Sequence, residues 1–129
     1  MFGLGGVVLE YNESSEMYLE TIYILEKEHG HAHVADIARD LKVTKPSVTK
    51  AMSHLEEEGL INNESYRPVT LTEKGKAVSE KIYRKHNLIT RFLEKSLDLS
   101  PGEAVANACR MEHVITENML NAIKQYLNK

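Results

Sequence analysis

Two short helical segments followed by a hairpin constrain the fold more than any other feature of this chain. Residues 34–41, VADIARDL, have apolar side chains at helical spacing, and the link KVT joins them to a second helical run, KPSVTKAMSHLEEEGL (45–60). Thr44 is a good N-cap for the second helix, Pro46 suits its first turn, and Gly59 ends it. Two helices joined in this way form a helix-turn-helix, whose second member can lie in the major groove of DNA.

A predicted hairpin follows this pair of helices. The β-prone runs 60–61 and 69–71 flank a polar tip, which contains Asn62, Asn63, Arg67 and Pro68. Upstream, residues 15–28 have the apolar spacing of an amphipathic helix, with Ser14 or Ser15 as its N-cap. The order helix, helix, helix, hairpin predicts a winged helix-turn-helix, in which the hairpin is the wing.

The rest of the chain has helical patterns only. Thr72 is the predicted N-cap of a long helix over residues 73–97, Ser100 starts a helix that runs to residue 113, and a last helix covers about 116–127. We therefore predict a mainly α protein with two domains. The winged helix-turn-helix domain spans residues 1–72, with 1–13 as a candidate flexible segment, and an all-helical domain spans residues 73–129.

Composition excludes several classes of protein. Among 129 residues there is one cysteine, so no internal disulfide forms, and no apolar run reaches the ~18 residues of a membrane span. The N-terminal segment is a poor signal peptide, so we expect a cytoplasmic protein with no membrane partner. The formal net charge of -3 does not indicate nucleic-acid binding, but the location of the positive charges matters more than their sum.

Positive and hydroxyl side chains gather at the start of the second helix of the helix-turn-helix. This arrangement suits DNA, because the N-terminal end of a helix attracts phosphates. The glutamates at 56–58 lie at the opposite end of the helix. Simple solvation of the lysines is the alternative for each one alone. We predict DNA contacts by Thr44, Lys45, Pro46, Ser47, Thr49, Lys50 and, on the wing, Arg67.

The hexapeptide CRMEHV (109–114) contains the only cysteine of the chain. In a helix, Cys109, Glu112 and His113 share one face because they are spaced i, i+3 and i+4. A thiolate, a carboxylate and an imidazole together can bind a divalent transition ion. The alternative is a small buried cysteine beside a solvated Glu/His pair.

Five segments, in this order, resemble the metalloregulator family of the diphtheria toxin repressor and the manganese repressor MntR. These segments are SEMYLETIY, SVTKAMSHLEEEGLI, LTEKGKAV, YRKHNLITRFL and ACRMEHV. The resemblance covers nearly all of residues 14–128. It implies the two-domain form, in which the all-helical domain of residues 73–129 serves metal binding and dimerisation, without the SH3-like third domain that longer members carry.

The resemblance also implies a set of metal ligands. Carried onto matching positions, the ligands are Met17, Glu20, His86, Cys109, Glu112 and His113. Because Met17 and Cys109 offer sulfur, as in the iron branch, we expect Fe²⁺; Mn²⁺ is the alternative because Glu20 matches the manganese branch. At two positions of the ancillary site of the iron branch, this chain has Thr90 and Val105, so a second ion is not expected there.

The predicted function is that of a homodimeric transcriptional regulator, a repressor of metal-uptake genes that metal binding activates and that binds double-stranded DNA at a palindromic operator. A winged-helix regulator that ignores metals is the alternative. A metal enzyme is a third class, but we expect no enzyme because no general base or nucleophile stands beside the predicted ligands. We expect the histidines at 29, 31, 33 and 54 to lie outside the metal site.

Overall fold

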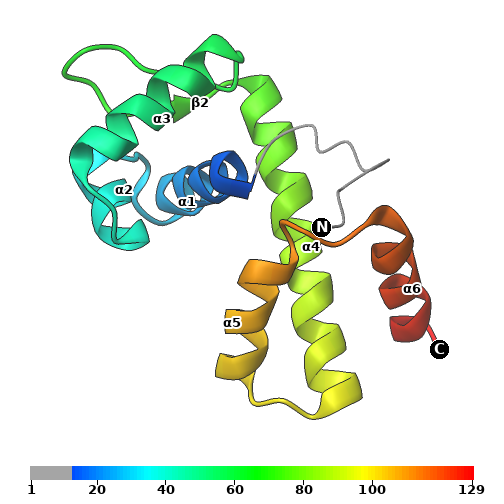
Figure 1. Cartoon of the computed structure of the whole chain (residues 1–129). Coiled ribbons are helices and arrows are strands. Elements are labelled where there is room, and N and C mark those ends of the chain that lie inside the picture. Colours follow the sequence, from blue (N-terminus) through cyan, green and yellow to red (C-terminus); the bar gives the residue numbers. More distant parts are fainter. Residues whose placement is uncertain (1–12) are drawn as a thin grey trace, which may run out of the picture. The chain divides into compact units, whose positions relative to one another are not determined.

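The computed structural model describes residues 13–129, so the candidate flexible segment lies almost wholly outside the described residues. The described part contains six helices and one two-stranded sheet (Figure 1). The elements are α1 Glu13–His29, α2 Val34–Leu41, α3 Lys45–Glu57, β1 Ile61–Asn62, β2 Thr70–Leu71, α4 Glu73–Leu97, α5 Pro101–Met111 and α6 Glu117–Leu127. The prediction of a mainly α fold with a helix-turn-helix is confirmed.

The described residues divide into two compact units, 14–81 and 82–129, and the division falls within α4. The predicted domain boundary between residues 72 and 73 stays a prediction. Among residues 13–129 no helix is long and apolar enough to cross a membrane.

The helix-turn-helix in the first unit is shaped by its caps. Lys42 ends α2 in the left-handed conformation, with φ 56°, and the Thr44 hydroxyl accepts a hydrogen bond of 3.2 Å from the Ser47 N–H at the start of α3. After α3, Gly59 has φ 77°, and the Leu60 N–H donates to the Leu55 carbonyl over 3.0 Å. This is a Schellman ending, which only glycine forms without strain at that position.

The wing is fixed at its base. β1 pairs with β2 in antiparallel register, Ile61 opposite Leu71. The outer edge of β2 is also satisfied, because the Val69 N–H donates to the Ala32 carbonyl over 2.8 Å and the Leu71 N–H donates to a Glu26 carboxylate oxygen over 3.2 Å. The wing is therefore attached to α1 and to the loop that follows α1.

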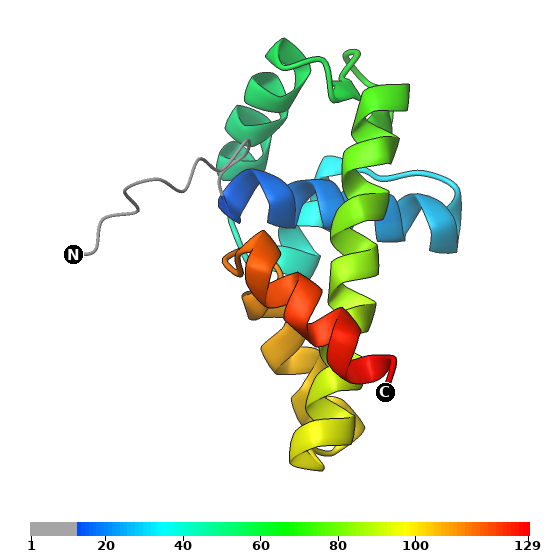
Figure 2. The ribbon, with the colours of Figure 1, turned by 90° about the vertical axis from the view of Figure 1, so that its right-hand side faces the viewer.

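α1 crosses the first half of α4, as both ribbon views show (Figures 1 and 2). The buried Ser79 hydroxyl donates to the Leu19 carbonyl over 3.4 Å at this crossing. Because α1 begins at Glu13 among the described residues, the prediction that Ser14 or Ser15 caps it is wrong. Both serines lie within the described part of α1 and not before it.

The second unit packs α5 and α6 against the second half of α4. Its buried core consists of Ile89, Leu93, Ala104, Ala108 and Ile123. The Ser100 hydroxyl accepts from the Glu103 N–H over 3.3 Å, as predicted for an N-cap. α5 ends at Met111, not at residue 113. The His113 N–H bonds to the Arg110 carbonyl, three residues back, over 3.4 Å, and so leaves the α-helical pattern.

Candidate metal centre and DNA-reading surface

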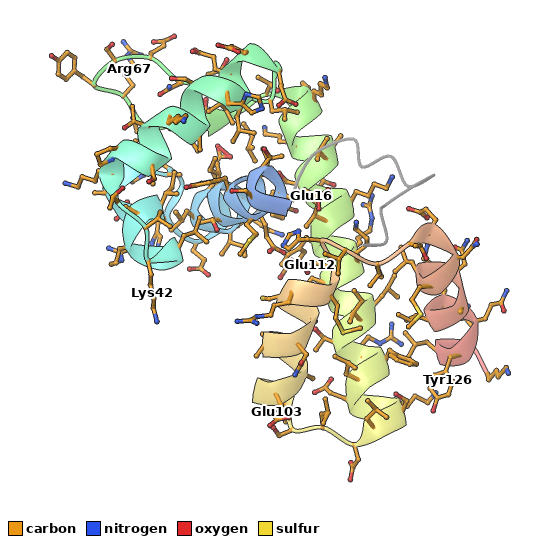
Figure 3. All side chains as sticks on the ribbon, viewed as in Figure 1. Glu16, Lys42, Arg67, Glu103, Glu112 and Tyr126 are labelled. Atoms are coloured by element: carbon orange, nitrogen blue, oxygen red, sulfur yellow. The ribbon has the colours of Figure 1, made fainter. Side chains whose placement is uncertain are left out.

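Four predicted metal ligands lie together in the unit of residues 82–129. His86 comes from α4 and Cys109 from the last turn of α5, while Glu112 and His113 follow α5 directly. The His86 Nδ1 atom lies 2.8 Å from Glu112 Oε2, and the His113 Nε2 atom lies 3.2 Å from Glu112 Oε1. One carboxylate thus lies between two imidazoles; Figure 3 labels Glu112 at the end of α5.

Small residues on α5 allow this arrangement. Ala104 and Ala108 are completely buried in the core cluster with Ile89 and Leu93 of α4. Their short side chains allow the two helix backbones to approach closely. Cys109, on the neighbouring face of α5, then lies within hydrogen-bonding distance of the His86 side chain on α4.

The electrostatics of His86 reflect this cluster. Its pKa is raised from 6.5 to about 10, mainly by a side-chain hydrogen bond with Cys109 and then by one with Glu112, against the lowering effect of burial. At neutral pH the His86 ring therefore keeps a proton, whose charge balances the Glu112 carboxylate.

The donor types fit a divalent transition ion. Glu112 is completely buried and His113 is 4% exposed, whereas Cys109 is exposed. A buried carboxylate is costly unless cationic or hydrogen-bonding groups surround it. Two imidazoles, one carboxylate and one thiol offer nitrogen, oxygen and sulfur donors, the mixture that suits first-row transition metals.

Thr90 and Val105, at the two positions of the ancillary site, differ in their surroundings. The Thr90 hydroxyl donates to the His86 carbonyl over 2.8 Å, so it is engaged with the backbone of α4. Val105 is an exposed apolar residue on α5 and offers no donor atom. The Tyr83 ring stacks 6.3 Å from that of His86. The stacked Tyr83 ring helps to fix the His86 side chain on α4.

Met17 and Glu20 lie one turn apart on α1, in the other unit, and share a face of that helix. Met17 is 41% exposed and Glu20 is 8% exposed. Their position on α1 is held by the bonds from Ser79 and from the wing strand described above. The role of all six residues as metal ligands stays a prediction.

The predicted DNA contacts on α3 are all on its exposed side. Val48, Met52 and Leu55 are buried on the opposite side and hold α3 against the rest of the unit. The Thr44 hydroxyl also donates to the Ser47 hydroxyl over 2.9 Å. The exposed set consists of Thr44, Lys45, Pro46, Ser47, Thr49 and Lys50. Their contacts with DNA stay predictions.

Arg67 lies on the wing loop, where Figure 3 labels it. Its Nε atom is 3.5 Å from a Glu64 carboxylate oxygen, and both side chains are exposed. The neighbouring Tyr66 is 108% exposed and has φ 62°. Sequence reasoning missed Tyr66, because neither its exposure nor its backbone conformation can be inferred from residue type.

The other histidines lie on the surface of the first unit. The His31 and His33 rings meet edge to face at 4.7 Å, and His29 lies 3.8 Å from a Glu28 oxygen. His54 pairs with Glu58 at 2.7 Å, near the acidic end of α3. These four residues belong to a different unit from the donor cluster.

A winged helix-turn-helix joined to a helical unit with transition-metal donors is typical of metal-responsive DNA-binding proteins. Two family models match the chain. Residues 10–69 match the iron dependent repressor N-terminal DNA binding domain, and residues 72–129 match the iron dependent repressor metal binding and dimerisation domain. The chain belongs to the iron-dependent repressor family.

Individual relatives agree with this assignment. The chain is 39% identical over 119 residues to the iron-dependent repressor IdeR of Mycobacterium tuberculosis, which covers 92% of this chain and 52% of IdeR. It is 34% identical over 110 residues to the regulator MntR of Geobacillus kaustophilus, covering 85% of this chain and 77% of MntR. The chain spans about half the length of several curated relatives that it matches, IdeR among them.

Solved structures give the same result for the fold. The structure of the manganese regulator SloR matches with a TM-score of 0.76 and 29% identity, covering 88% of this chain and 53% of SloR. The resemblance to the diphtheria toxin repressor and manganese repressor family is therefore confirmed.

Proposed function

We propose that this protein is a metal-activated DNA-binding repressor that works as a homodimer on a palindromic operator in the cytoplasm. Its activating ion is Fe²⁺, with Mn²⁺ as the alternative. The observation that carries this proposal is the cluster of His86, Cys109, Glu112 and His113 in a chain that also contains a winged helix-turn-helix. The family relationship supports the regulatory role.

Each residue of the cluster has a part in metal binding. A bound divalent ion would supply the positive charge that the His86 proton supplies in its absence. On binding the ion, His86 would give up that proton, Glu112 would offer its buried carboxylate, and His113 and Cys109 would add nitrogen and sulfur donors. We propose that Met17 and Glu20 complete the ligand set from α1, which the family resemblance and their one-turn spacing support.

This ligand set provides a route from metal binding to DNA binding. Ligands from α1 make the position of that helix depend on metal binding. α1 is in turn bonded to β2 of the wing through Glu26 and crosses α4 at Ser79. A coupling of about 1–3 kcal/mol between the two sites changes DNA affinity roughly 5- to 150-fold, and DNA tightens metal binding by the same factor.

On the DNA side, α3 enters the major groove with its N-terminal half foremost. Lys45 and Lys50 contact phosphates, and the exposed Ser47, Thr49 and Pro46 face base edges. The second copy in the dimer presents the same helix to the other half-site, so the two helices must match the groove repeat.

DNA binding measured across a series of divalent ions, without oxygen, tests the proposal. Fe²⁺ or Mn²⁺ is expected to tighten binding of wild type, and His113→Ala is expected to abolish this response. His29→Ala removes an exposed histidine outside the cluster and serves as the control that keeps the response. Equal DNA affinity with and without metal would instead favour the metal-independent winged-helix regulator.

A further inference from the structure

Tyr66, at the tip of the wing, is fully exposed and has a backbone conformation that is unfavourable for tyrosine. Glu64 to Arg67 form a turn, closed by the Arg67 N–H donating to the Glu64 carbonyl over 3.2 Å. Tyr66, the third residue of this turn, has φ 62° and is 108% exposed. This turn position with positive φ favours glycine or asparagine.

Tyrosine at this position is unfavourable for folding in two ways. A bulky side chain with positive φ is strained, since its Cβ approaches the neighbouring carbonyl. The exposed ring also gains nothing from burial, unlike Leu71 and Val69 at the wing base, which are both buried. A residue kept in a strained and exposed position is a candidate for a role in binding.

The base of the wing is rigid enough to present this ring in a fixed place. Asn62 donates from its side-chain amide to the Thr70 hydroxyl over 3.1 Å. The Thr72 hydroxyl donates to the Gly59 carbonyl over 2.7 Å, and the bonds from Val69 and Leu71 secure the outer edge.

We propose that the ring of Tyr66 packs against the sugar edge of the DNA minor groove, beside Arg67, whose contact with DNA is already predicted from the sequence. This inference deepens the DNA-binding role proposed above and rests on it. Deoxyribose offers an apolar surface to an aromatic ring, and the narrow minor groove attracts a guanidinium group. The wing thus reads groove width next to the site where α3 reads base edges.

The surroundings of Tyr66 favour DNA over a protein partner. Its neighbours in the tip are polar or charged, namely Asn63, Glu64, Ser65 and Arg67. A single ring without apolar neighbours is far smaller than a stable protein interface requires. A ring beside a cation suits nucleic acid, where the apolar sugar and the anionic phosphate alternate along the backbone.

The test compares variants of the full chain, loaded with the activating ion, on a duplex that wild type selects from a random-sequence pool. Tyr66→Gly should weaken binding at least about five-fold, while its midpoint of thermal unfolding stays the same or rises, because glycine relieves the strained φ. Tyr66→Phe keeps the ring and should bind as wild type does. Asp98→Gly is the matched control, since Asp98 also has positive φ (55°) but lies in the other unit.

Salt dependence separates the two tip residues. Tyr66→Gly removes no charge and should leave the slope of log affinity against log salt unchanged, whereas Arg67→Ala should reduce the slope by about 1. Wild-type affinity in Tyr66→Gly overturns the inference, even where metal still activates DNA binding. Loss of metal activation in wild type overturns the proposed function instead, and failure of wild type to select any duplex overturns both.

Discussion

The Nδ1 atom of His86 lies 2.8 Å from Oε2 of Glu112, so a single ion pair joins α4 to the turn after α5. The side chain of His86 is 14% exposed to solvent and that of Glu112 is 0% exposed. The pair therefore works in an environment where charge is poorly screened. Its protonation state affects both the stability of this unit and its readiness for a metal ion.

Stability of the metal-free protein is expected to fall as pH rises from about 6.5 to about 10. The pKa of His86 is about 10 in the folded protein and 6.5 as the reference value. In this interval the folded state binds more protons than the unfolded state, so raising the pH favours unfolding. The contribution is fully present below 6.5. Urea unfolding at several pH values, in the presence of a chelator, measures this slope.

Glu112→Gln provides the control for this slope. The amide keeps the shape of the side chain but removes one of the two groups that raise the pKa of His86, so this pKa should fall part of the way towards 6.5, while the larger effect of the Cys109 hydrogen bond remains. The pH dependence of stability then flattens over the same interval. A slope identical to that of wild type would contradict the assignment of the titration to this pair.

Gly75→Ala is expected to destabilise the first unit by about 1–3 kcal/mol. Gly75 lies in the first turn of α4, and a Cβ atom added there would collide with the backbone carbonyl of Leu60. Backbone atoms at the base of the wing cannot move aside as a flexible side chain can. Urea unfolding measures the loss.

Gly102→Ala is the matched control for Gly75→Ala. A Cβ atom at Gly102 meets nothing within 4 Å, and alanine favours the first turn of α5. Stability should stay the same or rise by up to about 1 kcal/mol. Equal losses from the two variants would show that the glycine itself, and not the contact with Leu60, determines the result.

Glu26→Ala is expected to loosen the wing. The Glu26 carboxylate accepts from the Leu71 N–H over 3.2 Å, and removal of an acceptor from a partly buried donor costs about 1–3 kcal/mol. Hydrogen exchange of the Leu71 amide should therefore become faster. Glu26→Gln keeps an acceptor oxygen and should restore protection, while Glu28→Ala, at an exposed position of the same helix, should have no effect.

Local signals in the sequence predicted the order of the elements well. Thr44 and Ser100 start helices because their hydroxyls satisfy free N–H groups, and Gly59 ends α3 because it adopts positive φ. These effects depend on neighbours within a few residues. They can therefore be inferred from the sequence without knowledge of the tertiary structure.

Contacts between distant residues could not be predicted in this way. The bond from Leu71 to Glu26 and the bond from Ser79 to Leu19 depend on how α1 lies in its unit. Cys109, Glu112 and His113 were found from their spacing, but that spacing says nothing of a hydrogen-bonding partner on α4. His86 entered the predicted site through family resemblance, and the structure brings it to Glu112.

Replacing sulfur donors by carboxylates is expected to shift the metal preference from Fe²⁺ towards Mn²⁺. Met17→Asp and Cys109→Glu, made together, convert two soft donors into hard oxygen donors, which Mn²⁺ prefers. The ratio of the Fe²⁺ and Mn²⁺ concentrations that half-activate DNA binding should change by about ten-fold, which corresponds to about 1.4 kcal/mol. Anaerobic titration of each ion against a fluorescent duplex measures the ratio. Asn107→Asp adds a carboxylate to α5 at an exposed position outside the cluster and should leave the ratio unchanged. An unchanged ratio in the double variant would mean that neither sulfur atom binds the ion.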